Sequence, residues 1–111
     1  MRLKKEKMKR LTDNEVDYNL TTLKGWVLDE HESRINKLFT FKNFNEAFNA
    51  MCDIADVAEE MGHHPDWYNS YNKLNIKLST HDAGGLTMKD FELAQRIEEI
   101  VTVEKAKRPR L

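Results

Sequence analysis

A change of hydrophobic period in the middle of the chain constrains the fold most strongly. Over residues 73–81, apolar and polar side chains alternate, which is typical of a strand with one buried face. Over residues 44–61, apolar side chains recur at steps of three or four, which is typical of an amphipathic helix. The apolar face predicted for this helix comprises Phe44, Ala47, Phe48, Met51, Ala55, Ala58 and Met61.

The ends of the predicted helix 44–61 are marked by specific residues. Asn43, with Glu46 three residues later, predicts the N-terminal cap. Gly62 stands where a left-handed residue usually ends a helix, and Pro65 prevents its continuation. Cys52 lies within the helix among apolar neighbours, so it is predicted to pack in the core rather than to act as a nucleophile.

The segments before this helix predict one more helix and a hairpin. Thr12 and Glu15 form a capping pattern at the start of a short helix over 11–22, which Gly25 ends. The stretches "GWVLDE" and "SRINKLFTF" predict two strands of a hairpin. In the second stretch, Lys37 is the exception on an otherwise apolar face.

The segments after this helix predict a final helix and leave one strand ambiguous. Thr87 and Asp90 form a possible capping box for the last helix. Residues 66–71 are a candidate fourth strand with an ambiguous pattern. The elements run α-β-β-α-β-α without it, which predicts an antiparallel sheet covered by helices on one face. The apolar stripe of the last helix comprises Phe91, Ala94, Ile97 and Val101.

Length and composition predict a single globular domain. The chain has 111 residues, of which 40% are hydrophobic and 33% charged. No run approaches the roughly 18 apolar residues of a membrane helix, and no signal peptide is visible. The single cysteine excludes an internal disulfide framework and favours a reducing compartment, the cytoplasm or the nucleus.

The net charge of -1 hides two basic ends. We expect a basic, disordered tail over residues 1–10, a domain over 11–103, and a second basic tail over 104–111. Basic tails can contact nucleic acid or direct nuclear import, but solvated ends are the more common outcome. The body between them is acidic, which argues against a nucleic-acid-binding face on the domain.

Three of the four histidines, His63, His64 and His81, are the candidate catalytic residues of the sequence. His63 and His64 are adjacent in an extended segment, so their rings should point to opposite sides. If the alternation of residues 73–81 continues to its end, His81 shares the polar face with Ser79. A zinc site is disfavoured because adjacent histidines seldom bind one ion, and Asp82 or Glu59 would have to help. Imidazoles without a metal suit proton transfer near neutral pH.

The spacing of these residues resembles a known family signature. Glu59, His63-His64-Pro65, Tyr71, His81 and Asp90 stand as in the pterin-4a-carbinolamine dehydratases, and the likeness spans about residues 11–103. The resemblance implies the order α-β-β-α-β-β-α, with a four-stranded antiparallel sheet and helices on one side. It also implies homodimers or homotetramers.

The resemblance further implies a hydro-lyase without cofactor or metal. The family removes water from 4a-hydroxytetrahydropterin, the product of aromatic amino-acid hydroxylases, and gives quinonoid dihydropterin. Some relatives also act as dimerisation cofactors of a homeodomain transcription factor, so a protein-binding module is the alternative function.

Site residues follow from the same resemblance. The catalytic residues are His63 and His81 as acid and base, with His64 orienting or protonating the pterin. Many relatives carry Asp or Asn where this chain has Gly62, so only a backbone contact is expected there. The implied substrate-binding set is Gly62, His63, His64, Ser79, Thr80 and His81, with support from Glu59, Trp67 and Asp90.

Overall fold

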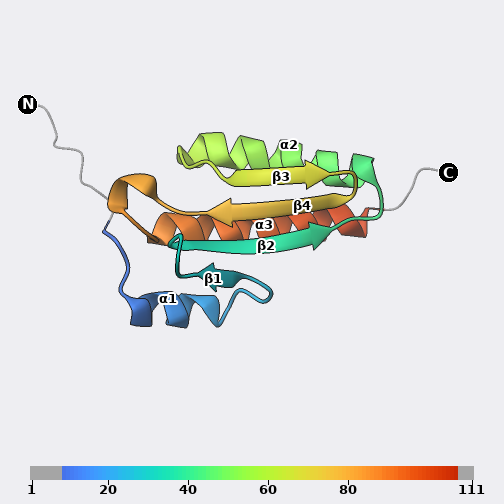
Figure 1. Ribbon diagram of the computed structural model, residues 1–111. Helices are drawn as coiled ribbons and strands as arrows, with labels where there is room; N and C mark the ends of the chain where they lie inside the picture. Colours follow the sequence, from blue (N-terminus) through green and yellow to red (C-terminus); the bar gives the residue numbers. More distant parts are fainter. Residues whose placement is uncertain (1–8, 108–111) are drawn as a thin grey trace, which may run out of the picture.

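Over the described part of the chain, four strands and three helices follow one another in the order expected from the resemblance. The computed structural model describes residues 9–107. The helices are α1 (Asp13–Leu20), α2 (Phe44–Met61) and α3 (Met88–Ala106), and a 3-10 turn, η1, covers His81–Ala83. The strands are β1 (Val27–Asp29), β2 (Arg34–Thr40), β3 (Asp66–Ser70) and β4 (Lys73–Leu78). Figure 1 shows α2 and α3 against the sheet and α1 beside β1.

All four strands pair antiparallel in the spatial order β1-β2-β4-β3. The ambiguous segment 66–71 supplies the edge strand β3, in which Trp67 pairs with Ile76 of β4. At the centre, Ile35 of β2 pairs with Leu78 of β4. The α+β fold with a four-stranded antiparallel sheet is therefore confirmed.

The core lies between the sheet and the helices. The predicted stripe of α3 is confirmed, because all four of its side chains are buried. Full burial of a side chain as large as Phe91, Ile97 or Val101 stabilises the fold by about 1.5–3 kcal/mol. From the sheet, the buried side chains are Ile35, Phe39, Leu74, Ile76 and Leu78.

The buried face of α2 differs from the predicted one. Phe44 and Phe48 remain 43% and 50% exposed and stack on each other with ring centroids 5.8 Å apart. Ala55 is also exposed. The side of α2 that faces the core carries alanine and β-branched aliphatic side chains instead, and both aromatic rings lie outside it. The residues of α2 that are buried are Ala47, Ala50, Ile54, Val57 and Ala58.

Cys52 shares this outward side of α2. Its side chain is free and exposed, so the prediction that it packs in the core was wrong. Cys52 is exposed because the side of α2 that faces the core passes through Ile54, which is buried, and not through Cys52 or Ala55.

Lys37 keeps its place on the inner face of the sheet through two partners. Its Nζ donates to Glu98 Oε1 at 2.5 Å and to the Lys24 carbonyl at 2.9 Å. The Trp26 indole also donates to Glu98 Oε1, at 2.8 Å. A half-buried ammonium is tolerated here because a carboxylate and a carbonyl accept its hydrogens.

The helix ends follow the predicted signals. The Asn43 side chain accepts from Glu46 N at 2.9 Å, and Gly62 closes α2 with φ of 62°. Thr12 and Glu15 form a reciprocal capping box on α1.

Strand β4 ends earlier than the alternation predicted. It stops at Leu78, Thr80 makes only an isolated bridge to Gly85, and His81 opens the 3-10 turn η1. The expectation that His81 extends the polar face of the strand was therefore wrong. Gly84, with φ of 71°, and the bridge across the neck of the loop turn the chain away from the sheet.

The predicted domain, residues 11–103, ends inside the last helix of the structure. Helix α3 reaches Ala106, so it includes the beginning of the predicted tail 104–111. Residues 1–8 and 108–111, which hold most of the first predicted tail and half of the second, lie outside the described residues. Among the helices of residues 9–107, none combines the length and apolarity that crossing a membrane requires.

Candidate active site

The end of α2 directs the two adjacent histidines to different environments. Gly62 N donates to the Glu59 carbonyl at 3.1 Å, and His63 N donates to the Ala58 carbonyl at 3.0 Å. This left-handed turn sends the His63 side chain into the protein, where it is buried, while His64 stays exposed. The two rings thus face different environments, as their adjacency in an extended segment predicted.

His63 contacts a buried carboxylate. Its Nε2 lies 2.6 Å from Oδ1 of Asp90, with side-chain exposures of 10% and 0%. Asp90 comes from the first turn of α3 and His63 from the end of α2, so the contact joins the two helices. A carboxylate without solvent access requires hydrogen-bond donors around both oxygens.

The second oxygen of Asp90 finds those donors in two threonines. Oδ2 accepts the Thr87 backbone N–H at 2.9 Å and the Thr80 hydroxyl at 2.8 Å. The hydroxyls of Thr80 and Thr87 are themselves 2.7 Å apart. Asp90 therefore caps α3, as its sequence position predicted, and in addition holds His63.

His64 also meets a carboxylate, but at the surface. Its Nε2 lies 2.8 Å from Glu59 Oε1, with side-chain exposures of 61% and 78%. Glu59 is one turn back on α2, so the pair spans the end of that helix. An exposed pair of this kind can turn to meet a ligand, because water competes for both partners.

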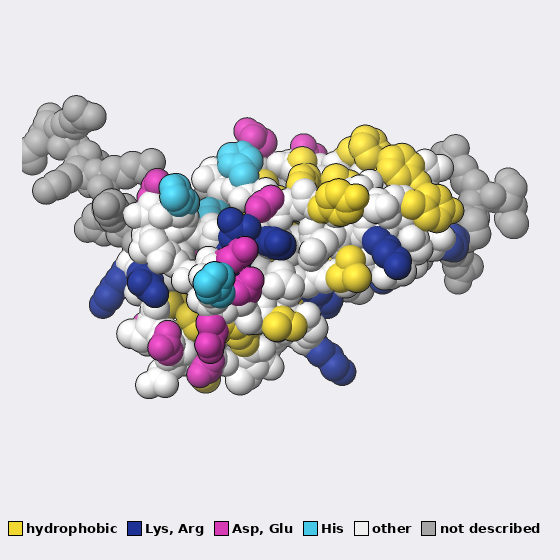
Figure 2. Space-filling model, viewed as in Figure 1, with side chains coloured by type: hydrophobic (Ala, Val, Ile, Leu, Met, Phe, Trp, Pro, Cys, Tyr) yellow, Lys and Arg dark blue, Asp and Glu magenta, His cyan; other side chains and the backbone are white. Residues whose placement is uncertain are grey.

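His81 is placed by the same network that holds His63. It follows Thr80 directly, and its loop is closed where Thr80 N donates to the Gly85 carbonyl at 3.0 Å. Thr80 bonds Asp90, and Asp90 bonds His63, so two side chains connect the base of the His81 loop to His63. Figure 2 shows histidine side chains gathered toward one end of the molecule.

The remaining predicted site residues take more modest positions. Trp67 is partly buried against the hydrophobic core, and Ser79 is half-buried. The Thr80 hydroxyl, expected at the substrate, is engaged inside the protein instead. Thr87 was predicted only as a helix cap, although the Thr-x-x-Asp pattern already marked it as a partner of Asp90.

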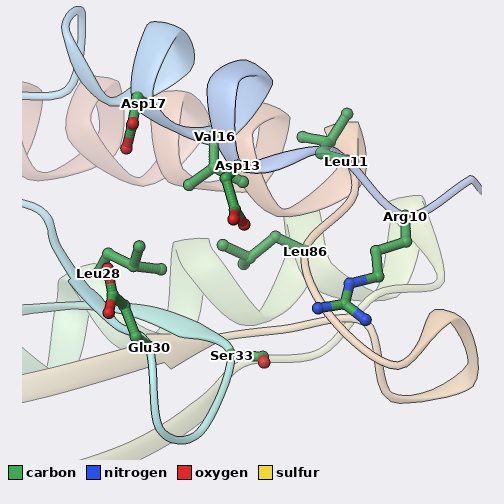
Figure 3. A pocket seen from close by; sticks show the side chains of 9 residues that line it. All are labelled: Arg10, Leu11, Asp13, Val16, Asp17, Leu28, Glu30, Ser33 and Leu86. Carbon is green, nitrogen blue, oxygen red and sulfur yellow. The ribbon is translucent and has the colours of Figure 1, made fainter.

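A separate hollow of about 460 Å³ lies between α1 and the β1–β2 turn. Figure 3 shows Asp13 and Leu86 near its middle, with Glu30 beside Leu28 on its far side. It contains none of the predicted site residues. Nowhere in residues 9–107 do three histidine, cysteine or acidic side chains converge as metal ligands would.

Comparison with known proteins gives one consistent result. The profile of the family described as pterin 4 alpha carbinolamine dehydratase matches residues 9–100. A Rhizobium johnstonii protein that carries the name pterin-4-alpha-carbinolamine dehydratase is 49% identical over 92 residues, which cover 83% of this chain and 91% of the relative. A Rhodospirillum rubrum protein of the same name is 46% identical, over 83% of this chain and 96% of its own.

Solved structures agree with the sequence relatives. The crystal structure of a transcriptional coactivator/pterin dehydratase from Brucella melitensis superposes with a TM-score of 0.82 at 36% identity, over 84% of this chain and 99% of that one. A pterin dehydratase-like protein described as a RuBisCO assembly factor shares the fold, with a TM-score of 0.61 at 19% identity, over 69% of this chain and 89% of that one. The profile match over most of the chain decides the matter: this chain belongs to the pterin-4a-carbinolamine dehydratase family of hydro-lyases.

Proposed function

We propose that the chain removes water from 4a-hydroxytetrahydropterin at the site formed by His63, His64 and His81. One observation carries the proposal: His63 is buried against Asp90, which also bonds the residue before His81. A histidine held in this way suits repeated proton transfer, because its ring keeps a fixed direction. Family membership supplies the class of substrate.

The reaction requires one base and one acid. The base takes the proton from N5 of the carbinolamine, and the electrons of that N–H bond form the C4a=N5 double bond. The C4a–O bond breaks, and the leaving hydroxyl takes a proton from the acid and departs as water. No electron is gained or lost overall, so two imidazoles in opposite protonation states suffice.

The geometry supports a division of labour among the three histidines. His63 and His81 exchange protons with the pterin, since the Asp90 network links their positions. His64, exposed beside Glu59, orients the substrate. Gly62 and the Ser79–Thr80 segment lie next to these histidines in the chain. In this proposal their backbone groups contact the pterin ring.

Stopped-flow mixing with freshly formed carbinolamine tests this proposal. The purified chain should accelerate dehydration well above the uncatalysed rate, and His81→Ala should remove most of that acceleration, about 10²- to 10⁴-fold. His31→Ala is the matched control, because His31 is exposed near the β1–β2 turn and has no assigned role. A wild-type chain no faster than buffer, at any tested concentration, would refute the dehydratase assignment.

Self-association is the second part of the proposal. Strands β1 and β3 are the edges of the sheet, and the stacked pair Phe44–Phe48 is exposed on α2. Figure 2 shows hydrophobic side chains gathered over the N-terminal part of α2 and over β3. Such surfaces favour homodimers or homotetramers. Light scattering should report more than one chain per particle, and Phe44→Ser with Phe48→Ser should lower that number; an unchanged particle mass would exclude this surface.

The exposed phenylalanines of α2 also support an alternative function, a coactivator module that binds a transcription-factor helix in the cytoplasm or nucleus. The Brucella melitensis relative is described as both coactivator and dehydratase. A pull-down with such helices, run beside the carbinolamine assay, separates the two functions. Capture with no catalysis would favour the coactivator, and catalysis without capture would favour the enzyme.

A further inference from the structure

We propose that Asp90, Thr80 and Thr87 are positioning residues that hold His63 with its hydrogen on Nε2, so that Nδ1 is the atom that exchanges a proton with the pterin. The inference rests on the proposed dehydration at His63. It adds which nitrogen reacts, which histidine starts as the base, and why a threonine outside the family signature matters.

Hydrogen-bond counting sets the direction of each proton in the network. The Thr87 backbone N–H can only donate, so Oδ2 of Asp90 is an acceptor. The Thr80 hydroxyl has a single hydrogen and gives it to the same oxygen. The Thr87 hydroxyl, 2.7 Å from that of Thr80, must then be the donor of the pair. The hydrogens of the Thr87 N–H and the Thr80 hydroxyl thus point to Asp90, and that of the Thr87 hydroxyl points to Thr80.

The contact with His63 completes this pattern. Oδ1 of Asp90 lies 2.6 Å from Nε2 of His63 and accepts the ring hydrogen. Because the Asp90 side chain is fully buried, solvent does not compete for this contact. A neutral imidazole that donates through one nitrogen keeps a lone pair on the other. In the proposed cycle His63 begins neutral and acts as the base through Nδ1, and the imidazolium that forms is stabilised by the adjacent carboxylate.

The same carboxylate sets the distance between the two reacting histidines. Thr80 directly precedes His81, and the bridge between Thr80 and Gly85 closes the loop that carries His81. Thr87 follows this loop in the chain. Asp90 thus holds His63 through one oxygen and the neck of the His81 loop through the other. A displacement near 1 Å can lower a rate about 10²-fold, so this shared attachment matters for the rate.

The dehydration then has a defined proton path. His63 Nδ1 takes the N5 proton while the C4a=N5 bond forms and the C4a–O bond breaks. His81, as imidazolium, gives its proton to the leaving hydroxyl, which departs as water. His63 and His81 have then exchanged protonation states, and proton exchange with solvent restores them.

Nitrogen NMR of the histidine-labelled chain tests the tautomer directly. In the wild type, neutral His63 should carry its hydrogen on Nε2. In Asp90→Asn, the amide oxygen is required by the Thr87 N–H, so the amide NH₂ faces Nε2 and the hydrogen should move to Nδ1. A wild-type hydrogen on Nδ1, or an unchanged tautomer in Asp90→Asn, would overturn the proposal.

Kinetics supply the second readout. Asp90→Asn should lower kcat about 10²-fold or more with a smaller change in KM, because the substrate still binds but meets no base. Thr87→Val should cost roughly five-fold, the value of one hydrogen bond, and Thr87→Ser should restore the rate. This pair keeps the test valid where Asp90→Asn does not fold. Equal rates for Thr87→Val and Thr87→Ser would contradict the role of the hydroxyl.

A matched control separates positioning from capping. Glu15→Gln alters the equivalent capping carboxylate of α1, away from the histidines, and should leave kcat and the His63 tautomer unchanged. An inactive wild type with hydrogen on Nε2 of His63 would refute the proposed function but not the hydrogen-bond assignment. An active wild type with the hydrogen on Nδ1 of His63 would support the proposed function and refute the hydrogen-bond assignment.

Discussion

The two adjacent histidines meet carboxylates in opposite surroundings. His63 lies 2.6 Å from the fully buried Asp90, and His64 lies 2.8 Å from Glu59, whose side chain is 78% exposed. An exposed pair contributes about 0–1 kcal/mol, because water and salt screen it. A buried carboxylate must keep all its donors, since each lost partner leaves a desolvated group behind. Similar contacts therefore give one fixed ring and one adjustable ring.

The capping boxes repeat this contrast. Thr12 and Glu15 cap α1 at the surface, whereas Thr87 and Asp90 cap α3 in the interior. Only the buried box has a carboxylate oxygen directed at a histidine. A common helix-start motif thus becomes part of a site when it is buried beside the end of another helix.

The largest effect on stability should come from breaking the buried pair. Asp90→Ala removes the acceptor of the Thr87 N–H, the Thr80 hydroxyl and the His63 ring, so the free energy of unfolding should fall by about 2–4 kcal/mol. Glu59→Ala should lower it by less than about 1 kcal/mol. Urea unfolding of both variants measures the difference. Equal losses would show that burial does not separate the two pairs.

Substitution of Gly62, in the turn that ends α2, should have the next largest effect on the free energy of unfolding. Gly62 has φ of 62° and nothing within 4 Å of an added Cβ, so backbone conformation rather than space requires glycine. Gly62→Ala should lower the free energy of unfolding by roughly 1–2 kcal/mol, and Gly62→Asn by less, because Asn adopts the left-handed region more readily. Thermal unfolding of the two variants checks this order, and a more stable alanine variant would contradict it.

The exposed capping box should give the smallest effect, and one that depends on pH. The backbone hydrogen bond from Thr12, followed by that of its hydroxyl, lowers the pKa of Glu15 from its ordinary value of 4.5. A lowered folded-state pKa contributes stability above the unfolded value and loses it as pH falls through the folded value. Unfolding below pH 4.5 should therefore show a slightly shallower pH dependence in Glu15→Gln than in the wild type. An identical slope would exclude this contribution.

Local signals predicted most of the fold. The caps at Thr12 and Asn43 and the stop at Gly62 depend on neighbouring residues, and the structure has all three. The buried face of α2 was harder to predict, because apolar residues cover two neighbouring sides of the helix and packing against α3 and β4 buries one of them. The exposed Phe44–Phe48 pair is the part that this choice left outside.

The candidate site could be predicted only in part, for a similar reason. The motif named His63, His81 and Asp90, but the contact of His63 with Asp90 joins residues 27 positions apart and depends on how two helices end. The turn at His81 also depends on a bridge between Thr80 and Gly85, which no alternation of apolar residues encodes. Residue types were visible in the sequence, whereas their hydrogen bonds required the fold.

In the proposed mechanism, the buried His63 transfers protons and the exposed His64 holds the substrate. Stopped-flow dehydration kinetics of His63→Ala and His64→Ala, run in parallel, test it most directly. We expect His63→Ala to lower kcat about 10²- to 10⁴-fold, whereas His64→Ala should mainly raise KM and leave kcat within about ten-fold. A larger loss of kcat in His64→Ala than in His63→Ala would contradict it.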